Sequence, residues 1–470
     1  MNKQRIISSN RKRLVCAAAA AAVVLFLAGG ANALANTVWT VTRSSSVSVC
    51  ALPASTTCNT IGAAVSAASL FDIIMVKPGY YNETVYVGTS NLTIMGAQAG
   101  KDAREGRNDP SQESIVDASG TPSGMGAGAA FYINGAADVV IDGFTIQGGG
   151  LATPLADQHG AAGIFVAGTN TAHIRNNIFR NNAAGVDLSS PGSGYKAGGL
   201  IEHNLFKSNN AGKVGSADAV FKGLAGFGIV GSGALVMGAA ITENAFEENL
   251  AAAVALFNAS SVEVTKNTSR EDGSFAVFYS SAFCFFSQNQ GRDFGAKGFL
   301  NLPNTTPPGH ADAAVDVDSD TAIEINGNDL EEGKTSGYNG IAFTTLLGTV
   351  ASSQCRVTNN TIKRFGGNGI VAGEGPVGEP LNGGTLEASS ISGNYVADNG
   401  NDGILLTEGA PNFANWLVDN KAEGNHTNDC EDDTYLFGHG AGTALTYNTW
   451  FNNSGGLSLP AGLCSPGTWH

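Results

Sequence analysis

The sequence has 470 residues, of which 40 are acidic and 25 are basic, so its formal net charge is −15. A surface this acidic repels polyanions, which argues against nucleic acid and anionic membranes as partners. Glycine accounts for 63 residues, roughly twice the usual share, and this favours a fold with many tight turns.

The first 35 residues have the pattern of a secretory signal peptide. Five basic side chains precede an apolar run from Leu14 to Gly29, and small residues follow up to Ala35. The apolar run is shorter than the roughly 20 residues that a membrane-spanning helix needs. We therefore expect a secreted, extracellular protein, cleaved after Ala33 or Ala35, with no membrane insertion afterwards.

Residues 36–125 are predicted to form an N-terminal cap and the first coils of a repeated stack. Cys50 and Cys58 flank a short loop and are expected to form a disulfide, which export permits. The alanine-rich segment from Ile61 to Ala68 predicts a short helix that covers the open end of the stack. Strand-like segments follow up to residue 96, and residues 97–125 are expected to be a polar loop.

Residues 126–429 carry an internal repeat. The segment from Ile174 to Phe179 reads Ile-Arg-Asn-Asn-Ile-Phe, and its asparagine recurs every 22 to 40 residues. Related segments begin at Ile201, Ile241, Val264, Phe286, Ile325, Val357, Ile391 and Leu417. Between most of them lies a second unit, a glycine or alanine followed by an apolar-x-apolar strand such as Gly163 to Val166.

Such short strands cannot bury an inner face alone, so the repeat predicts an all-β solenoid, a parallel β-helix. Coils stacked about 4.8 Å apart would place like residues on like. Phe179, Phe206 and Phe246 would form an internal aromatic ladder. The repeated asparagines would form a second ladder at one turn, each amide bonding the next coil, because asparagine tolerates a left-handed backbone.

The other four cysteines outside the leader fall into two groups in this arrangement. Cys284 and Cys355 are predicted to be free, buried thiols, because two coils would separate their Cα atoms by about 10 Å, beyond the roughly 7 Å of a disulfide. Cys430 and Cys464 are predicted to form a disulfide that pins residues 430–470 as a C-terminal cap.

The chain resembles the bacterial secreted, pectin-lyase-like right-handed parallel β-helix proteins. The segment from Ile61 to Ala97 looks like their opening, and the Ile-x-x-Asn-x-Phe and Gly-Ile-x-Leu repeats look the same. The resemblance implies a right-handed β-helix and an extracellular polysaccharide as partner. It leaves the chemistry open, because the superfamily includes lyases, epimerases, hydrolases, methylesterases and surface proteins without activity.

The chain has no counterpart of the pectin methylesterase signature. Pieces similar to polygalacturonase motifs occur at Asn428-Asp429, Asp432-Asp433 and Gly438 to Gly440. They lie within 13 residues, whereas the enzymes spread them over successive coils, so we interpret the match as accidental.

One column of charged residues is the first candidate site. Three positions after the ladder asparagine lie Arg180, Lys207, Glu247, Arg270, Arg292, Glu331 and Lys363, and one position later lie Glu248, Glu271, Asp293 and Glu332. Neighbouring carboxylates can hold Ca²⁺, so Glu248 and Glu332 are candidate calcium ligands. Arg270 and Arg292, with Glu271 and Asp293, are the candidate catalytic residues, since the resembled lyases use an arginine as proton acceptor. The alternative is a solvated edge of ion pairs, each worth under about 1 kcal/mol.

Three further sets of residues are candidates. Asp316 and Asp318 share an outer strand face and are candidate metal ligands. Phe165, Asp187 and Phe278 are assigned to the outer column of the Gly-x-x-x strands as substrate-binding residues, since aromatic rings can stack on sugars. The third set, His203, Glu243 and Lys266, is a possible acid–base group or a polar stripe.

The sequence therefore predicts a protein that binds or processes extracellular polysaccharide. The leading hypothesis is calcium-assisted lyase or epimerase chemistry, and the alternative is a non-catalytic surface or adhesive protein.

Overall fold

The computed structural model describes residues 36–43, 50, 55–120, 128–150, 162–188, 196–209, 226–233, 236–295, 313–332, 338–344, 351–373, 386–407, 412–437 and 440–466. Residues 36–470 belong to one compact unit. The predicted signal peptide, residues 1–35, lies outside the described residues. Within these ranges no helix has the length and apolar character needed to cross a membrane.

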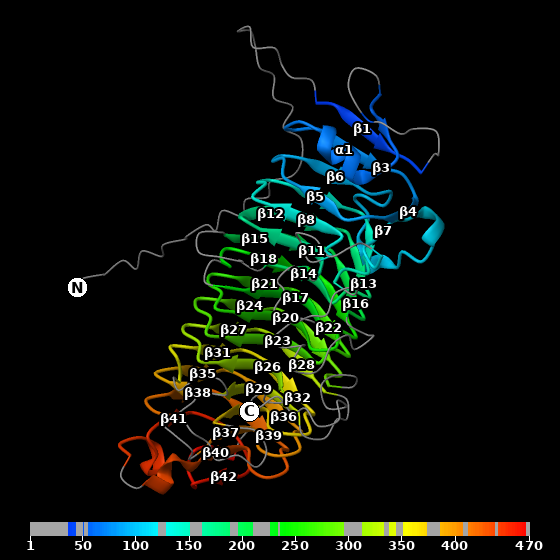
Figure 1. Cartoon of the computed structure of the whole chain (residues 1–470). Coiled ribbons are helices and arrows are strands. Elements are labelled where there is room, and N and C mark those ends of the chain that lie inside the picture. The colour runs from blue at the N-terminus through cyan, green and yellow to red at the C-terminus, as the bar shows by residue number, and fades with distance from the viewer. Residues whose placement is uncertain are drawn as a thin grey trace, which may run out of the picture. The chain divides into compact units, whose positions relative to one another are not determined.

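Short strands arranged in three long parallel sheets make up most of the described chain (Figure 1). Sheet 1 contains β1 (Val38–Val41), β2 (Thr57–Cys58), β3 (Ile73–Val76), β6 (Thr93–Met95), β9 (Val140–Asp142), β12 (Thr169–Arg175), β15 (Ala197–Glu202), β18 (Ala240–Thr242), β21 (Glu263–Thr265), β24 (Phe285–Ser287), β27 (Glu324–Asn326), β31 (Arg356–Thr358), β35 (Ser390–Ser392), β38 (Trp416–Val418) and β41 (Thr449–Phe451).

Sheet 2 contains β4 (Gly79–Asn82), β7 (Ser114–Asp117), β10 (Thr145–Gln147), β13 (Ile178–Arg180), β16 (Leu205–Lys207), β19 (Ala245–Glu247), β22 (Thr268–Arg270), β25 (Gln290–Arg292), β28 (Asp329–Glu331), β32 (Thr361–Lys363), β36 (Tyr395–Ala397) and β39 (Lys421–Glu423). Sheet 3 contains β5 (Val85–Val87), β8 (Phe131–Asn134), β11 (Ala162–Ala167), β14 (Ala184–Asp187), β17 (Phe227–Ser232), β20 (Ala252–Phe257), β23 (Ser274–Tyr279), β26 (Ala313–Asp318), β29 (Asn339–Thr344), β33 (Ile370–Ala372), β37 (Ile404–Leu406), β40 (Cys430–Asp432) and β42 (Ser458–Leu459). A small additional pair joins β30 (Ser352–Ser353) and β34 (Leu386–Glu387).

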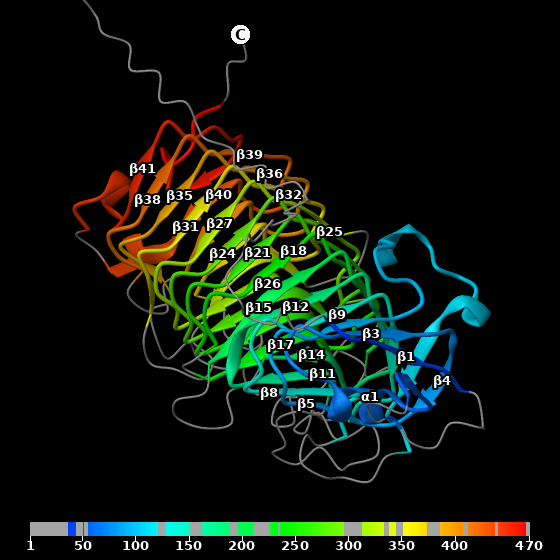
Figure 2. The same ribbon diagram turned by 90° about the horizontal axis from the view of Figure 1, so that it is seen from above.

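The chain visits the three sheets in turn and then returns one rung further along. From β12 it passes to β13 and β14, and β15 then pairs with β12. Strands of sheet 1 consequently run side by side along one face in Figure 2, although they are far apart in sequence. The predicted parallel β-helix is confirmed, and the interior between the sheets forms one continuous apolar core.

Like residues do stack on like in the interior. Phe179 and Phe206 are buried with ring centroids 4.7 Å apart, and Phe206 and Phe246 follow at 4.9 Å. The rings are nearly parallel, at 5° and 11°. The predicted aromatic ladder is confirmed, and the pairing of Phe179 with Phe206 and Phe206 with Phe246 sets the register of sheet 2.

The predicted asparagine ladder is also present, at the turn between sheets 1 and 2. Its members are Asn177, Asn204, Asn244, Asn267, Asn289, Asn328, Asn360, Asn394, Asn420 and Asn453. The side-chain oxygen of Asn204 accepts hydrogen bonds from the backbone N–H (2.9 Å) and the amide (3.2 Å) of Asn177. The left-handed residue of each such turn precedes the ladder asparagine, as at His203 (φ 56°), so our expectation that the asparagine itself is left-handed is wrong.

The N-terminal end of the stack is closed by a short helix, as the sequence predicts. Helix α1 (Ile61–Ala67) begins after Thr60, whose side chain accepts a hydrogen bond from the N–H of Ala63, and α1 packs on β1, β3 and β5. Near it Cys50 is bonded to Cys58. Residues 114–117 of the predicted loop form strand β7.

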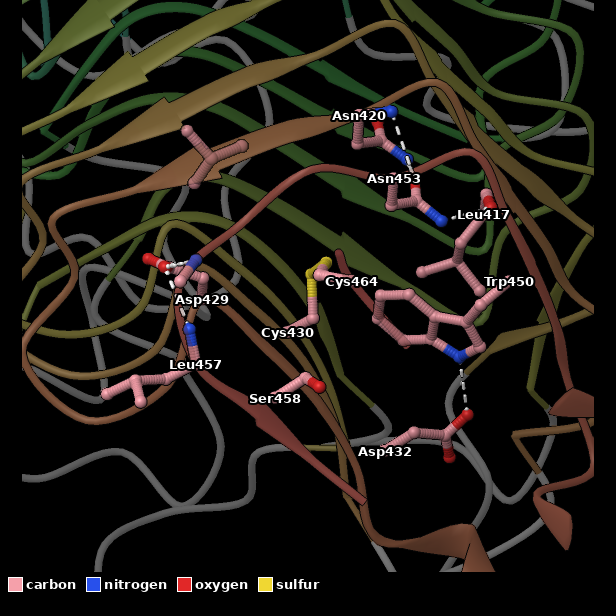
Figure 3. Close-up of a disulfide and its surroundings, with 12 residues drawn as sticks. Leu417, Asn420, Asp429, Cys430, Asp432, Trp450, Asn453, Leu457, Ser458 and Cys464 are labelled. Carbon is pink, nitrogen blue, oxygen red and sulfur yellow. Dashed lines mark hydrogen bonds between the residues drawn. A yellow bond between two sulfur atoms is a disulfide. The ribbon is translucent and has the colours of Figure 1, made fainter. Parts of the chain in front are cut away.

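At the C-terminal end Cys430 is bonded to Cys464, beside the buried indole of Trp450 (Figure 3). Residues after 430 still supply the coil strands β40, β41 and β42, so the stack extends into the region that we assigned to the cap. Cys284 and Cys355 are free and buried, as predicted.

Candidate active site

The predicted charged column exists. Arg180, Lys207, Glu247, Arg270, Arg292, Glu331 and Lys363 pair in register along sheet 2. Glu248, Glu271 and Asp293 follow on three consecutive coils, each partly exposed and each with a φ of 57°. The backbone therefore aims these three side chains outward from equivalent turns.

Glu332 does not join them, so our expectation of four aligned exposed carboxylates is wrong. Its backbone is not left-handed, and its side chain therefore leaves the turn in a different direction. The residue is fully buried, and its carboxylate accepts a hydrogen bond from the N–H of Gly366 at 3.1 Å.

The two candidate arginines form ion pairs at this edge. Arg270 contacts Glu271 at 2.8 Å, and Arg292 contacts Asp329 at 2.6 Å and Glu331 at 3.4 Å. Carboxylates beside a guanidinium stabilise its charged form, which opposes a role as proton acceptor. The contacts therefore favour the alternative interpretation, a surface edge joined by ion pairs.

Across the described ranges, no three His, Cys, Asp or Glu side chains are grouped so that they could hold a metal ion. On β26, Asp316 accepts a hydrogen bond from Thr344 at 2.9 Å and Asp318 from Ser319 at 2.8 Å, and both are buried. Burial, together with the charges of Asp318 and Asp316, raises the pKa of the nearby Asp320 carboxyl.

The predicted substrate-binding column of sheet 3 is only partly correct. Phe165 and Asp187 pair in register on the outer side, as predicted, but they are just 3% and 2% exposed. Phe278 faces the core, so its assignment is wrong. Val277 occupies the outer column instead, where it pairs with Asp316. The prediction is displaced by one residue because this strand carries Phe275 where the neighbouring coils have glycine or alanine. A displacement of one residue along a strand exchanges its inner and outer faces.

The third predicted set does come together. His203 Nε2 lies 3.2 Å from Glu243, and Lys266 Nζ lies 3.8 Å from the same carboxylate. Arg104 reaches Glu243 from the loop at 3.9 Å. This loop encloses a pocket of about 610 Å³. Its wall includes Lys101, Asp102, Glu105, Arg107, Asp109 and Glu113. Arg107 pairs with Glu113 within the loop and donates a hydrogen bond to the carbonyl of Asn176 on the coils, so charged groups here hold the loop in place.

A carboxyl pair that the sequence interpretation missed lies near the C-terminal end of sheet 3. Glu431 on β40 pairs with Leu405 on β37, which places it in the same outer column as Asp187 and Asp316. Asp402, just before β37, is hydrogen-bonded to Glu431.

Asn428 holds both members of this pair. Its backbone N–H donates to Asp402 at 2.8 Å, and its amide donates to Glu431 at 2.7 Å. The N–H of Asp402 donates in turn to Asn368 at 3.0 Å. Each carboxyl group is thereby fixed by an asparagine of its own coil or of a neighbouring coil.

One member of the pair, Asp402, has a raised pKa. Burial, followed by the hydrogen bond and the negative charge of Glu431, raises the pKa of Asp402 to about 7. Asp402 is buried, whereas Glu431 is partly exposed. Two carboxyl groups of which one keeps its proton can act as acid and base on the same bond.

A signal for the pair was present in the sequence. Our sequence analysis interprets the segment after Asn428 only as an accidental motif match. Extending the repeat by one coil aligns Gly403 to Leu406 with Asp429 to Asp432, and this places Glu431 in the column.

Comparison with known proteins addresses the fold. A family model described as a right handed beta helix region matches residues 129–330. The catalytic domain of a GH87 alpha-1,3-glucanase in complex with nigerose has a TM-score of 0.53 at 12% identity, over 86% of this chain and 68% of that one. A double mutant of the periplasmic alginate epimerase AlgG has a TM-score of 0.44 at 10% identity, over 82% of this chain and 78% of that one. The complex of XylC with xylose has a TM-score of 0.45 at 11% identity, over 81% of this chain and 86% of that one.

A search of curated protein sequences finds no match. At identities this low, a structural likeness speaks for the fold alone. The stacked parallel sheets and the matching family model together make this chain a right-handed parallel β-helix protein.

Proposed function

We propose that the protein processes extracellular polysaccharide by cleaving glycosidic bonds, with Asp402 as acid and Glu431 as its carboxylate partner. The observation that carries the proposal is the pair of carboxyl groups held by Asn428 at sheet 3, in which the pKa of Asp402 is raised to about 7. Glycoside hydrolysis requires one protonated and one ionised carboxyl group beside the same bond.

The geometry suits this chemistry. Asp402 and Glu431 come from adjacent coils. Asn428 donates a hydrogen bond to each of them, which keeps the two carboxyl groups beside one another. Asp402 would protonate the leaving oxygen, and Glu431 would stabilise or attack the sugar carbon. The fold shared with a glucanase catalytic domain supports polysaccharide as the substrate class.

The test is a screen of neutral and uronate polysaccharides, each with and without calcium. We expect new reducing ends from a neutral polysaccharide. Asp402→Asn and Glu431→Gln should each lower the rate by at least about 100-fold, while Asp293→Asn on the exposed acidic column should leave it unchanged. Because the acid form of Asp402 is required, the rate should fall as the pH rises through about 7.

The same screen separates the other hypotheses. Unsaturated products that need calcium would favour the lyase chemistry predicted from Glu248, Glu271 and Asp293. Binding without any product would favour the non-catalytic surface protein. Reducing ends formed equally fast by Asp402→Asn would refute the proposed pair.

Secretion is part of this proposal. We expect the exported protein to begin at Leu34 or Asn36, after removal of the leader. N-terminal sequencing of protein recovered from the medium tests this, and a retained leader would contradict it.

A further inference from the structure

Aromatic side chains gather on the outer face of sheet 1 at its C-terminal end. Trp416 on β38 is 58% exposed and Phe451 on the neighbouring strand β41 is 67% exposed. Phe413 is 42% exposed, and its ring lies 5.4 Å from that of Tyr447. These four residues, Phe413, Trp416, Tyr447 and Phe451, are called the aromatic platform below.

The outward strand positions around the platform carry no charge, and the exposed carboxylates of Glu387, which pairs with Phe413, and Asp419 flank it. On β35, β38 and β41 the remaining outward side chains are Ser390, Ser392, Val418 and Thr449. Three other strands of this face carry a charged side chain at a corresponding position, namely Glu263 on β21, Glu324 on β27 and Arg356 on β31. On a chain with a net charge of −15, rings and hydroxyl groups that are flanked by carboxylates favour a neutral ligand over a polyanion.

The platform is held rigidly from beneath. Leu417 and Trp450, the inward residues of the same two strands, are buried, and the indole N–H of Trp450 donates to Asp432 at 2.8 Å (Figure 3). Asn420 donates to Asn453 at 2.9 Å where the strands end. A surface that is already ordered loses little conformational entropy on binding.

We propose that the aromatic platform binds a neutral polysaccharide chain. The negative face of an aromatic ring attracts the weakly positive C–H groups of a sugar ring, so Trp416 and Phe451 would each stack on a sugar. Hydroxyl groups of Ser390 and Thr449 would bond to the sugar hydroxyls. The proposal names the polymer class for the proposed function, on which it rests for its choice of ligand.

The test measures binding of soluble neutral glucans, with alginate as the charged comparison, in the Asp402→Asn background so that the polymer stays intact. We expect binding to a neutral glucan and not to alginate. Trp416→Ala and Phe451→Ala should each weaken binding about fivefold to tenfold, and the double variant should abolish it. Phe285→Ala removes another exposed aromatic ring of sheet 1 and should have no effect.

Trp416→Phe is the control for a folding defect. It keeps an aromatic ring at the site and should retain most of the binding. It should also remove the change in tryptophan fluorescence that binding produces. Three results would overturn the proposal: no neutral glucan binds, Trp416→Ala and Phe451→Ala bind as tightly as the parent, or sedimentation shows a dimer that Trp416→Ala dissociates. Cleavage in the parent protein is measured separately, so failure of the Asp402–Glu431 pair leaves this readout intact.

Discussion

The interior of this β-helix and its outer faces are built from the same coils, but they differ in how closely one coil resembles the next. Inside, the ladder asparagine recurs on ten coils and phenylalanine on three. Outside, a column changes from Leu405 to Glu431 or from Ser390 to Trp416 in a single step. Inner side chains must pack and form hydrogen bonds with the same positions of the next coil, which keeps those positions alike. Outer side chains face solvent, so a functional residue can appear at an outer position of a single coil.

The largest expected effect lies inside. Phe206→Ala removes the middle ring of the aromatic ladder and leaves a cavity between Phe179 and Phe246, which should cost about 3–5 kcal/mol in the free energy of unfolding. Leu205→Ala, whose side chain points outward from the same strand, is the matched control and should cost much less. Denaturant titration of both variants measures the difference. Equal losses of unfolding free energy in the two variants would contradict the greater importance of the interior position.

An interior ladder that ends in a carboxyl group offers the next test. Asn182, Asn209 and Asn249 form a second amide ladder whose last acceptor is Asp272, at 2.8 Å from the Asn249 amide. Burial raises the pKa of Asp272 to about 7. Between its ordinary value of 3.8 and about 7 the folded protein holds a proton that the unfolded chain has lost, so stability falls as the pH rises through this window.

Asp272→Asn should remove that dependence, because an amide oxygen still accepts from Asn249. We expect the variant and the parent to be about equally stable at pH 4. As the pH rises to 8 the variant should become more stable than the parent by up to a few kcal/mol, which melting temperatures measured at each pH would show. Asp293→Asn, on an exposed turn, should show no such trend. A parent–variant difference that is constant across this range would contradict the assignment.

The smallest effect is expected outside. Arg292→Met removes the contacts to Asp329 and Glu331, and exposed ion pairs are each worth under about 1 kcal/mol. The loss should shrink further in high salt. Enzymatic activity should survive. A large loss of activity with unchanged stability would restore Arg292 as a catalytic candidate.

The fold could be predicted because its determinants repeat. The stacking of Phe206, the asparagine ladder and the free Cys284 all followed from one alignment of short segments, since identical rungs impose identical needs. The left-handed position was misplaced by one residue, because asparagine occurs both at His203-like positions and in the ladder itself. Sequence composition alone does not separate these two roles.

The site was harder to predict because its residues do not repeat. Phe278 was assigned to the wrong face by a shift of one residue, and Glu332 was taken as exposed because its backbone angle cannot be read from the column. Asp402 acquires its raised pKa from burial and from Glu431, which is 29 residues away in the sequence. Neither influence is visible until the coils are stacked.

The asparagine ladder has a direction. Every side-chain oxygen accepts from the coil before it and every amide donates to the coil after it, so each rung presents the same donor on one side and the same acceptor on the other. A duplicated coil, such as residues 267–288, would meet matching groups at both joints. The protein can therefore be lengthened or shortened by whole coils without requiring a new ladder contact between them.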